Sequence, residues 1–184
     1  METTDPEFPP LPPGYEGRMP RHGEPPVLWP VGRDTSGREA SLAPGAALAW
    51  EAMRERAAGD GAELLLVSAF RSVARQRTIV AGKLARGIAW ADILAVSAYP
   101  GFSEHHSGRA VDLGAPGCED LAEGFERTAQ FAWLLSHAGR FGFALTYPGG
   151  NRFGIAYEPW HWCHAGGDGA SPGARNPADG QQSL

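Results

Sequence analysis

The sequence is poor in lysine and cysteine and has no long hydrophobic run. Lys83 is the only lysine, so arginine carries nearly all the positive charge, and the formal net charge is −5. A chain without a basic excess lacks the electrostatic footprint of nucleic-acid binding. No run approaches the roughly 18 apolar residues that a membrane span requires. Two cysteines, Cys118 and Cys163, are too few for a disulfide scaffold, and they are either buried thiols or one bridge.

The amino terminus lacks the features of a secretory signal. Residues 1–7 are acidic and contain Pro6, and they offer neither a positively charged segment nor an apolar one. The sequence as written predicts a cytoplasmic protein, or a periplasmic or cell-wall protein if an export signal has been removed. Reduced thiols fit the cytoplasmic prediction better than a bridge does.

Length and proline distribution predict one domain with two peripheral segments. At 184 residues the chain is long enough for one real core. Residues 1–40 are proline-rich and aperiodic, which predicts an arm that is extended or partly disordered. Its Tyr15, Leu28 and Trp29 suggest that part of it lies against the domain. Residues 41–166 carry the periodic segments. Residues 167–184 are rich in glycine, alanine and proline and predict a flexible tail.

The periodic part predicts helices before most of the strands. Pro44 suits the first turn of one helix, and Ser72 is expected to cap another. Helical spacing places Leu48, Met53 and Leu135 toward the core. The expected helices cover residues 44–58, 73–86, 90–96 and 119–138, and the expected strands cover residues 63–70, 110–113, 141–147 and 155–163. This order favours an α+β fold, in which helices cover an antiparallel sheet.

A first chemical motif lies in residues 103–113, which place His105 and Asp112 on either side of Gly108. Strand alternation puts Asp112 on the same face as the small Ala110. A carboxylate in such a place needs a partner, because an unpaired buried charge is costly. The partner could be a metal ion shared with His105, or equally a salt bridge or hydrogen bond to a nearby imidazole. This stretch alone leaves both open.

A second motif contains Glu158 and His161. A regular strand would turn residues three apart to opposite faces, but Pro159 can break the ladder and allow a bulge. Taken singly, Glu158 is more often a surface carboxylate and His161 a core histidine. Together with His105 and Asp112, His161 could complete the open three-ligand arrangement of catalytic zinc, and Glu158 could then serve as general base.

Further segments extend these motifs. They are Ser68-Ala69-Phe70-Arg71-Ser72 with Gln76, Tyr99-Pro100-Gly101-Phe102-Ser103-Glu104-His105 continuing to Gly108, Ala110 and Asp112, Phe141-Gly142-Phe143, and Tyr157-Glu158-Pro159-Trp160-His161. In this order they resemble the VanY-type D-alanyl-D-alanine carboxypeptidases, zinc peptidases of a superfamily that includes lysostaphin-like enzymes and the hedgehog domain. The resemblance covers roughly residues 40–166. It implies a hedgehog/DD-peptidase-like single domain whose central antiparallel sheet carries a zinc site.

The resemblance also implies roles for individual residues. His105, Asp112 and His161 would bind one Zn²⁺ per chain. Glu158 would take a proton from the water that the metal activates and deliver it to the leaving amine.

Substrate contacts are implied by the same comparison. Arg71 would stabilise the developing oxyanion or the substrate carboxylate, since a guanidinium stays charged. Gln76 and Ser103 would hydrogen-bond the substrate. Trp160 could line the pocket or belong to the core.

Two single residues and one short segment depart from the family pattern and concern the substrate rim. His106 stands where glutamine is more common, and Phe70 where tyrosine is usual. Trp162-Cys163-His164 replaces an aromatic-Arg-Tyr segment. On a strand His164 would face away from His161, so we do not expect it to be a metal ligand.

The predicted function is a zinc metallopeptidase that hydrolyses the terminal D-Ala-D-Ala or related D-amino acid bond of peptidoglycan stem peptides. Within the same chemistry, a D-Ala-D-Ala dipeptidase or a peptidoglycan endopeptidase is the alternative. A non-catalytic, zinc-stabilised muropeptide-binding module is a further alternative, against which Glu158 and Arg71 argue. The oligomeric state is left open.

Overall fold

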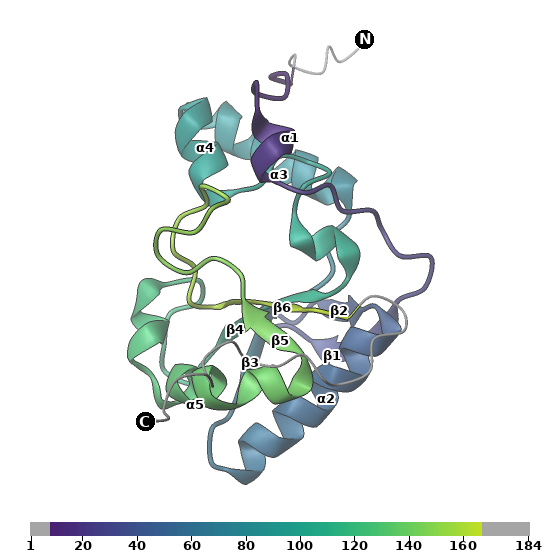
Figure 1. Ribbon diagram of the computed structural model, residues 1–184, viewed down its shortest axis with the longest axis vertical. Helices are drawn as coiled ribbons and strands as arrows, with labels where there is room; N and C mark the ends of the chain where they lie inside the picture. The colour runs from purple at the N-terminus through teal and green to yellow at the C-terminus, as the bar shows by residue number, and fades with distance from the viewer. Residues whose placement is uncertain (1–7, 167–184) are drawn as a thin grey trace, which may run out of the picture.

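The computed structural model describes residues 8–166 and centres on a four-stranded sheet (Figure 1). The strand order is β3 (Leu65–Ser68), β4 (Ala110–Gly114), β6 (His161–His164) and β5 (Phe143–Leu145). Every neighbouring pair is antiparallel. Helices and an antiparallel sheet in one domain confirm the predicted α+β fold.

The two faces of the sheet have different tasks. Val111, Leu113 and Trp162 point into the main hydrophobic core, where they are 0%, 0% and 3% exposed. Helices α2 (Pro44–Gly59) and α5 (Ala129–His137) cover this face, as Figure 1 shows. Because side chains alternate along a strand, Asp112 lies on the opposite face. The core face therefore anchors the strand that presents the polar face.

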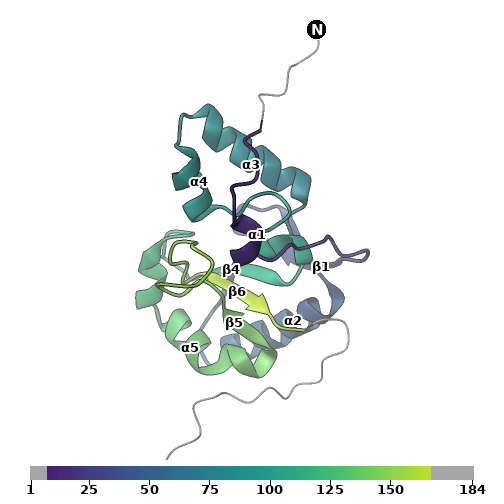
Figure 2. The ribbon, with the colours of Figure 1, turned by 45° about the horizontal axis from the view of Figure 1, so that its top comes forward.

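A second, smaller core lies on the other side of the sheet. Helices α1 (Tyr15–Arg18), α3 (Val73–Ala85) and α4 (Trp90–Val96) lie there together (Figure 2). Tyr15 is 1% exposed and packs edge-on against Phe102, with ring centroids 5.2 Å apart. Its hydroxyl accepts a hydrogen bond from the Tyr99 amide at 2.9 Å. The expectation that Tyr15 rests against the domain is confirmed.

The proline-rich segment is more regular than an extended arm. It contains α1 and the hairpin of β1 (Trp29–Arg33) with β2 (Glu39–Leu42). Proline has no amide hydrogen to donate to a β-ladder. Pro30 is tolerated because it lies where the register shifts, between Pro30 and Gly32. Trp29, expected against the domain, is 44% exposed. The domain boundary at residue 40 stays a prediction, and the predicted tail lies outside the described residues.

Two helix predictions are corrected by the structure. Residues 119–138 do not form one helix, because a 3₁₀ turn (Glu123–Arg127) precedes α5 and Thr128 separates them. The Thr128 hydroxyl caps α5 by accepting from the Phe131 amide at 3.2 Å. Leu48 and Leu135 are 58% and 61% exposed, so the buried faces of α2 and α5 are rotated relative to the predicted ones.

Other predictions about elements have mixed outcomes. The predicted strand over residues 155–163 is wrong, since only His161 to Cys163 of that range are in β6. The predicted cap of α3 is confirmed, because the Ser72 hydroxyl accepts from the Arg75 amide at 3.1 Å. Cys118 and Cys163 are free thiols. No helix within residues 8–166 is long and apolar enough to cross a membrane.

Candidate active site

Three predicted metal ligands converge on the polar face of the sheet. Asp112 of β4 and His161 of β6 are directly paired across the strands, which places their side chains on one face. Asp112 Oδ1 lies 3.0 Å from His161 Nδ1, and Asp112 Oδ2 lies 3.2 Å from His105 Nε2. The three ligand atoms lie within 4.8 Å of one another and all three residues are buried. They form a group that could hold one metal ion.

A tight turn brings His105 to this group. His105 lies in a 3₁₀ turn, η1 (Glu104–Ser107), which ends at Gly108 with φ of +66°. That left-handed conformation favours glycine. The Ala43 amide donates to the Gly108 carbonyl at 2.8 Å, and a Cβ at Gly108 would lie 2.9 Å from that nitrogen. A glycine is therefore required where the chain passes from His105 to β4.

The hydrogen-bond partners of both imidazoles suit metal binding. His105 Nδ1 lies 2.7 Å from the Ala69 carbonyl, which only accepts, so Nδ1 carries a proton and Nε2 faces Asp112 with its lone pair. His161 Nε2 lies 2.9 Å from Glu104 Oε2, a carboxylate oxygen that accepts. In the neutral ring Nε2 therefore carries the proton, and the lone pair of Nδ1 is available to a metal ion. Partners of this kind orient histidine ligands in metal sites. The donor set of two imidazoles and one carboxylate fits zinc.

Glu104 was missed by the sequence analysis as a functional residue. It comes from η1, it is 12% exposed at the side chain, and it orients His161 across the site. Burial opposes its ionisation, but hydrogen bonds from His161 and Thr146 outweigh burial and lower the pKa of Glu104. Its place beside His105 in the Ser-Glu-His segment was the signal available in the sequence.

The charges of the group are balanced by a proton on His161. Burial works against that proton, but hydrogen bonds to Asp112 and Glu104 prevail and raise the pKa of His161 to about 10. Burial also opposes ionisation of Asp112, yet the two histidines hold its pKa well below the usual range. Burial lowers the pKa of His105. A divalent cation can take the place of the His161 proton, because metal binding requires deprotonated ligands.

A β-turn carries Glu158 to the same site. The His161 amide donates to the Glu158 carbonyl at 3.1 Å, and Pro159 occupies the second turn position, which proline favours. A turn, rather than the expected bulge, places Glu158 Oε2 4.0 Å from His161 Nδ1. Burial raises the pKa of Glu158 to about 7, with Asp112 adding and nearby cations opposing. Such a carboxyl group can exchange a proton near neutral pH.

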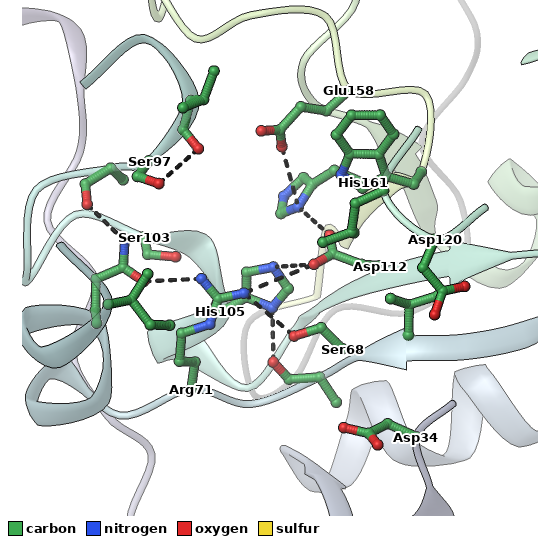
Figure 3. A pocket seen from close by; sticks show the side chains of 18 of the residues that line it. Asp34, Ser68, Arg71, Ser97, Ser103, His105, Asp112, Asp120, Glu158 and His161 are labelled. Carbon is green, nitrogen blue, oxygen red and sulfur yellow. Dashed lines mark hydrogen bonds and ion pairs between the residues drawn. The ribbon is translucent and has the colours of Figure 1, made fainter. Parts of the chain in front are cut away.

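Arg71 follows β3 and points into the same space, as Figure 3 shows. Its guanidinium donates to Gln76 Oε1 at 2.9 Å and to Ser68 Oγ at 3.3 Å, and it lies 3.8 Å from Asp112 Oδ2. Gln76 also donates to the Ala98 carbonyl at 2.7 Å and is 1% exposed. Gln76 thus orients Arg71, and its direct substrate contact stays a prediction.

With the exception of Glu104, which lies behind His161, these groups line one pocket of about 820 Å³. It contains every site residue predicted from the sequence: Arg71, Gln76, Ser103, His105, Asp112, Glu158 and His161. Trp160 both lines the pocket and packs on the main core. Tyr147, which the sequence analysis did not single out, stacks on His161 with ring centroids 4.7 Å apart. The pocket therefore combines the proposed metal group, a carboxyl group and a guanidinium.

The neighbouring histidines are used elsewhere. His106 Nε2 accepts from the Gly101 amide at 3.1 Å, so its Nδ1 donates to the Arg71 carbonyl at 2.6 Å. His164 packs edge-on against Phe143, with ring centroids 5.3 Å apart. Neither residue belongs to the three-residue metal group found within residues 8–166.

Known proteins resemble this chain in both sequence and structure. The family model described as VanY, D-alanyl-D-alanine carboxypeptidase, matches residues 39–167. The bifunctional D-Ala-D-Ala dipeptidase and carboxypeptidase VanXYC of Enterococcus gallinarum is 32% identical over 79% of this chain and 77% of its own length. The putative carboxypeptidase YodJ of Bacillus subtilis is 36% identical over 66% of this chain. The match spans only 45% of YodJ.

Solved structures give the same relationship. The LdcB LD-carboxypeptidase superposes with a TM-score of 0.70 at 32% identity, covering 78% of this chain and 70% of that one. VanYB in complex with D-alanine-D-alanine gives a TM-score of 0.61 at 27% identity, covering 76% and 77%. A VanY D,D-pentapeptidase variant in complex with Zn(II) gives a TM-score of 0.58 at 27% identity, covering 76% and 79%. Because the family model matches residues 39–167 of this 184-residue chain, the chain belongs to the VanY D-alanyl-D-alanine carboxypeptidase family.

Proposed function

We propose that the protein is a zinc-dependent carboxypeptidase that releases the C-terminal D-alanine of peptidoglycan stem peptides. The observation that carries the proposal is the shared pocket of Glu158 with the group His105, Asp112 and His161. The substrate class is taken from the family and from relatives whose names specify D-Ala-D-Ala. The VanYB structure in complex with D-alanine-D-alanine supports a small peptide ligand.

The three ligands would hold one zinc ion. Zinc in such a site supplies a Lewis acid that lowers the pKa of water and polarises a carbonyl. Glu158 is positioned to take the proton of the attacking water and then to protonate the leaving amine. Its pKa of about 7 suits both transfers, because the same group must accept and then donate.

Arg71 would stabilise the negative charge that develops on the scissile carbonyl oxygen. Hydrogen bonds to Gln76 and Ser68 fix its guanidinium before substrate arrives. A donor held in place needs no reorganisation as charge develops, which is the source of electrostatic stabilisation in active sites. Its 3.8 Å distance from Asp112 Oδ2 keeps it beside the metal group.

The direct test is release of D-alanine by the zinc-loaded protein. A stem pentapeptide is the expected substrate, and Glu158→Gln should abolish turnover while zinc stays bound. No release from any stem peptide by a protein shown to contain zinc would overturn the proposal. Full activity of Glu158→Gln would remove Glu158 from the mechanism.

A substrate panel separates the related activities. Stem tripeptide, tetrapeptide, pentapeptide and the free dipeptide would each be offered to the zinc-loaded protein. Pentapeptide turnover supports D,D-cleavage, tetrapeptide turnover supports the bond specificity that the LdcB name indicates, and dipeptide turnover supports a dipeptidase. Muropeptide affinity without hydrolysis would instead favour the binding module.

A further inference from the structure

The chain's only lysine lies in the active-site pocket, where the chemistry proposed above assigns it no role. Lys83 is in the last turn of α3, it is half-buried, and it lines the same cavity as Arg71 and Glu158. Most lysines extend their ammonium group into bulk water. A single lysine whose ammonium group faces a catalytic pocket therefore calls for an explanation.

The ammonium group of Lys83 is held but not neutralised. Its Nζ donates to Ser97 Oγ at 2.6 Å, and Ser97 Oγ in turn donates to the Val96 carbonyl at 2.7 Å. Within residues 8–166 Lys83 forms no ion pair with a carboxylate. Burial lowers the pKa of Lys83, while the charge of Glu158 opposes this effect from across the pocket. A partly desolvated cation without an anionic partner is suited to bind an anion.

The site's other cation is already engaged. The guanidinium of Arg71 is bound to Gln76 and Ser68 and lies beside Asp112. Arg71 therefore faces the place where the scissile carbonyl would lie.

Two further arginines line the pocket, but Arg38 is paired with Asp34 and Arg75 is exposed. Lys83 is thus the half-buried cation of the pocket that has no anionic partner within residues 8–166, and it can meet a second negative group of the substrate.

The two ends of the pocket differ in charge. Figure 3 shows Ser97 and Ser103 on one side of the metal group, and Asp34 and Asp120 on the other. On the Ser97 side the wall is made by α3 and the end of α4, which contact each other. Asp34 is paired with Arg38, but Asp120 accepts only from the Thr35 hydroxyl and has no cationic partner within residues 8–166. A peptide's carboxylate end would be repelled by Asp120, so it belongs at the Ser97 side.

We infer that Lys83, supported by Ser97, binds the C-terminal carboxylate of the residue that is cleaved off. This carboxylate lies one residue beyond the scissile carbonyl, a span of roughly 3.5 Å along an extended chain. Lys83 thereby restricts cleavage to the last peptide bond of a free acid. The inference rests on the proposed function and assigns a specificity-determining residue to it.

Binding can be measured without turnover, because the single lysine gives a single side-chain signal. In zinc-loaded protein with ¹³C,¹⁵N-labelled lysine, N-acetyl-D-alanine should shift the Lys83 signal saturably, and N-acetyl-D-alaninamide should not. Calorimetry should show about tenfold or greater preference for the acid, and Lys83→Met should abolish that preference. No shift with the acid, equal shifts with both compounds, or a preference that survives in Lys83→Met would overturn the inference.

Kinetics separate a specificity role from a structural one. Lys83→Met should raise KM for stem pentapeptide about tenfold or more with kcat little changed. Lys83→Arg keeps the positive charge and should have a KM close to that of the wild type. Arg54→Met is the control, since it removes an exposed charge from α2, no residue of which lines the pocket, and it should leave KM unchanged. An unchanged KM in Lys83→Met, or an equal increase in Arg54→Met, contradicts the inference. If the wild type binds the acid through Lys83 but cleaves no stem peptide, the proposed function fails and the carboxylate site stands.

Discussion

At the scale of single residues, the carboxyl group of Glu158, which we propose as the general base, is expected to destabilise the fold once it ionises. Its side chain is 16% exposed, and burial raises its pKa from 4.5 to about 7. Between these values the folded protein holds a proton that the unfolded chain has released. The free energy of unfolding contributed by Glu158 is therefore fully present below about pH 4.5 and is lost as pH rises through about 7.

Glu158→Gln should consequently stabilise the metal-free protein in alkaline solution. Because glutamine does not ionise, the variant avoids the cost of a buried charge, about 2–3 kcal/mol at pH 8. At pH 4.5 the two proteins should unfold at nearly the same urea concentration. Urea unfolding of both metal-free proteins across this range measures the difference. A difference that does not change with pH would contradict the raised pKa.

Glu104 makes a second prediction at this scale. Glu104→Gln keeps the size of the side chain but removes the charge that holds His161 Nε2 at 2.9 Å. Zinc affinity should fall roughly 10- to 100-fold, as for other carboxylates that orient a ligand histidine. Competition with a chromophoric chelator measures the affinity directly. Glu119→Gln, at an exposed position, is the control and should bind zinc as the wild type does. Equal affinities in all three proteins would refute the role of Glu104.

At the scale of elements, the turn between η1 and β4 decides whether the ligands meet. Gly108 and Gly117 both have φ in the left-handed region, at +66° and +77°. A Cβ at Gly108 would lie 2.9 Å from the Ala43 nitrogen, whereas a Cβ at Gly117 would meet nothing within 4 Å. Both alanine variants should be less stable than the wild type by about 1–2 kcal/mol, because alanine is disfavoured in the left-handed conformation.

Gly108→Ala should lose more than Gly117→Ala, by about 1 kcal/mol or more, because Ala43 must also move. It should also weaken zinc binding, since His105 and Asp112 lie on either side of the turn. Urea unfolding and zinc titration of the two variants provide the comparison. Equal loss of stability would show that backbone conformation alone explains the requirement for glycine.

The elements also show what the sequence could and could not predict. Strand alternation correctly placed Asp112 opposite the core, and the Ser72 cap was readable from residue type. The path from Ile155 to Trp160 was not predictable from pattern, because the segment is irregular, with Ile155 packed in the second core and Trp160 on the main core. The role of Glu104 depends on a contact 57 residues away, which local pattern does not contain.

At the scale of the whole molecule, the site brings together residues that are far apart in the sequence. His105 and His161 are separated by more than fifty residues, and two hydrophobic cores lie on opposite sides of the sheet that brings them together. The pocket is lined by the sheet, by α3 and the end of α4, and by residues around the β1–β2 turn. A metal ion bound to the group would therefore link separate segments and favour the folded state.

Zinc should raise the thermal midpoint of the protein by mass action. At free zinc 100 times above Kd the expected stabilisation is about 2.7 kcal/mol, if the unfolded chain binds none. Asp112→Asn removes a ligand that both histidines contact and should lose the zinc-dependent shift in Tm. His164→Gln is the matched test of a nearby histidine that packs on Phe143, and it should keep the full shift. Calorimetry with and without zinc gives both answers, and loss of the shift in His164→Gln would place the metal centre elsewhere.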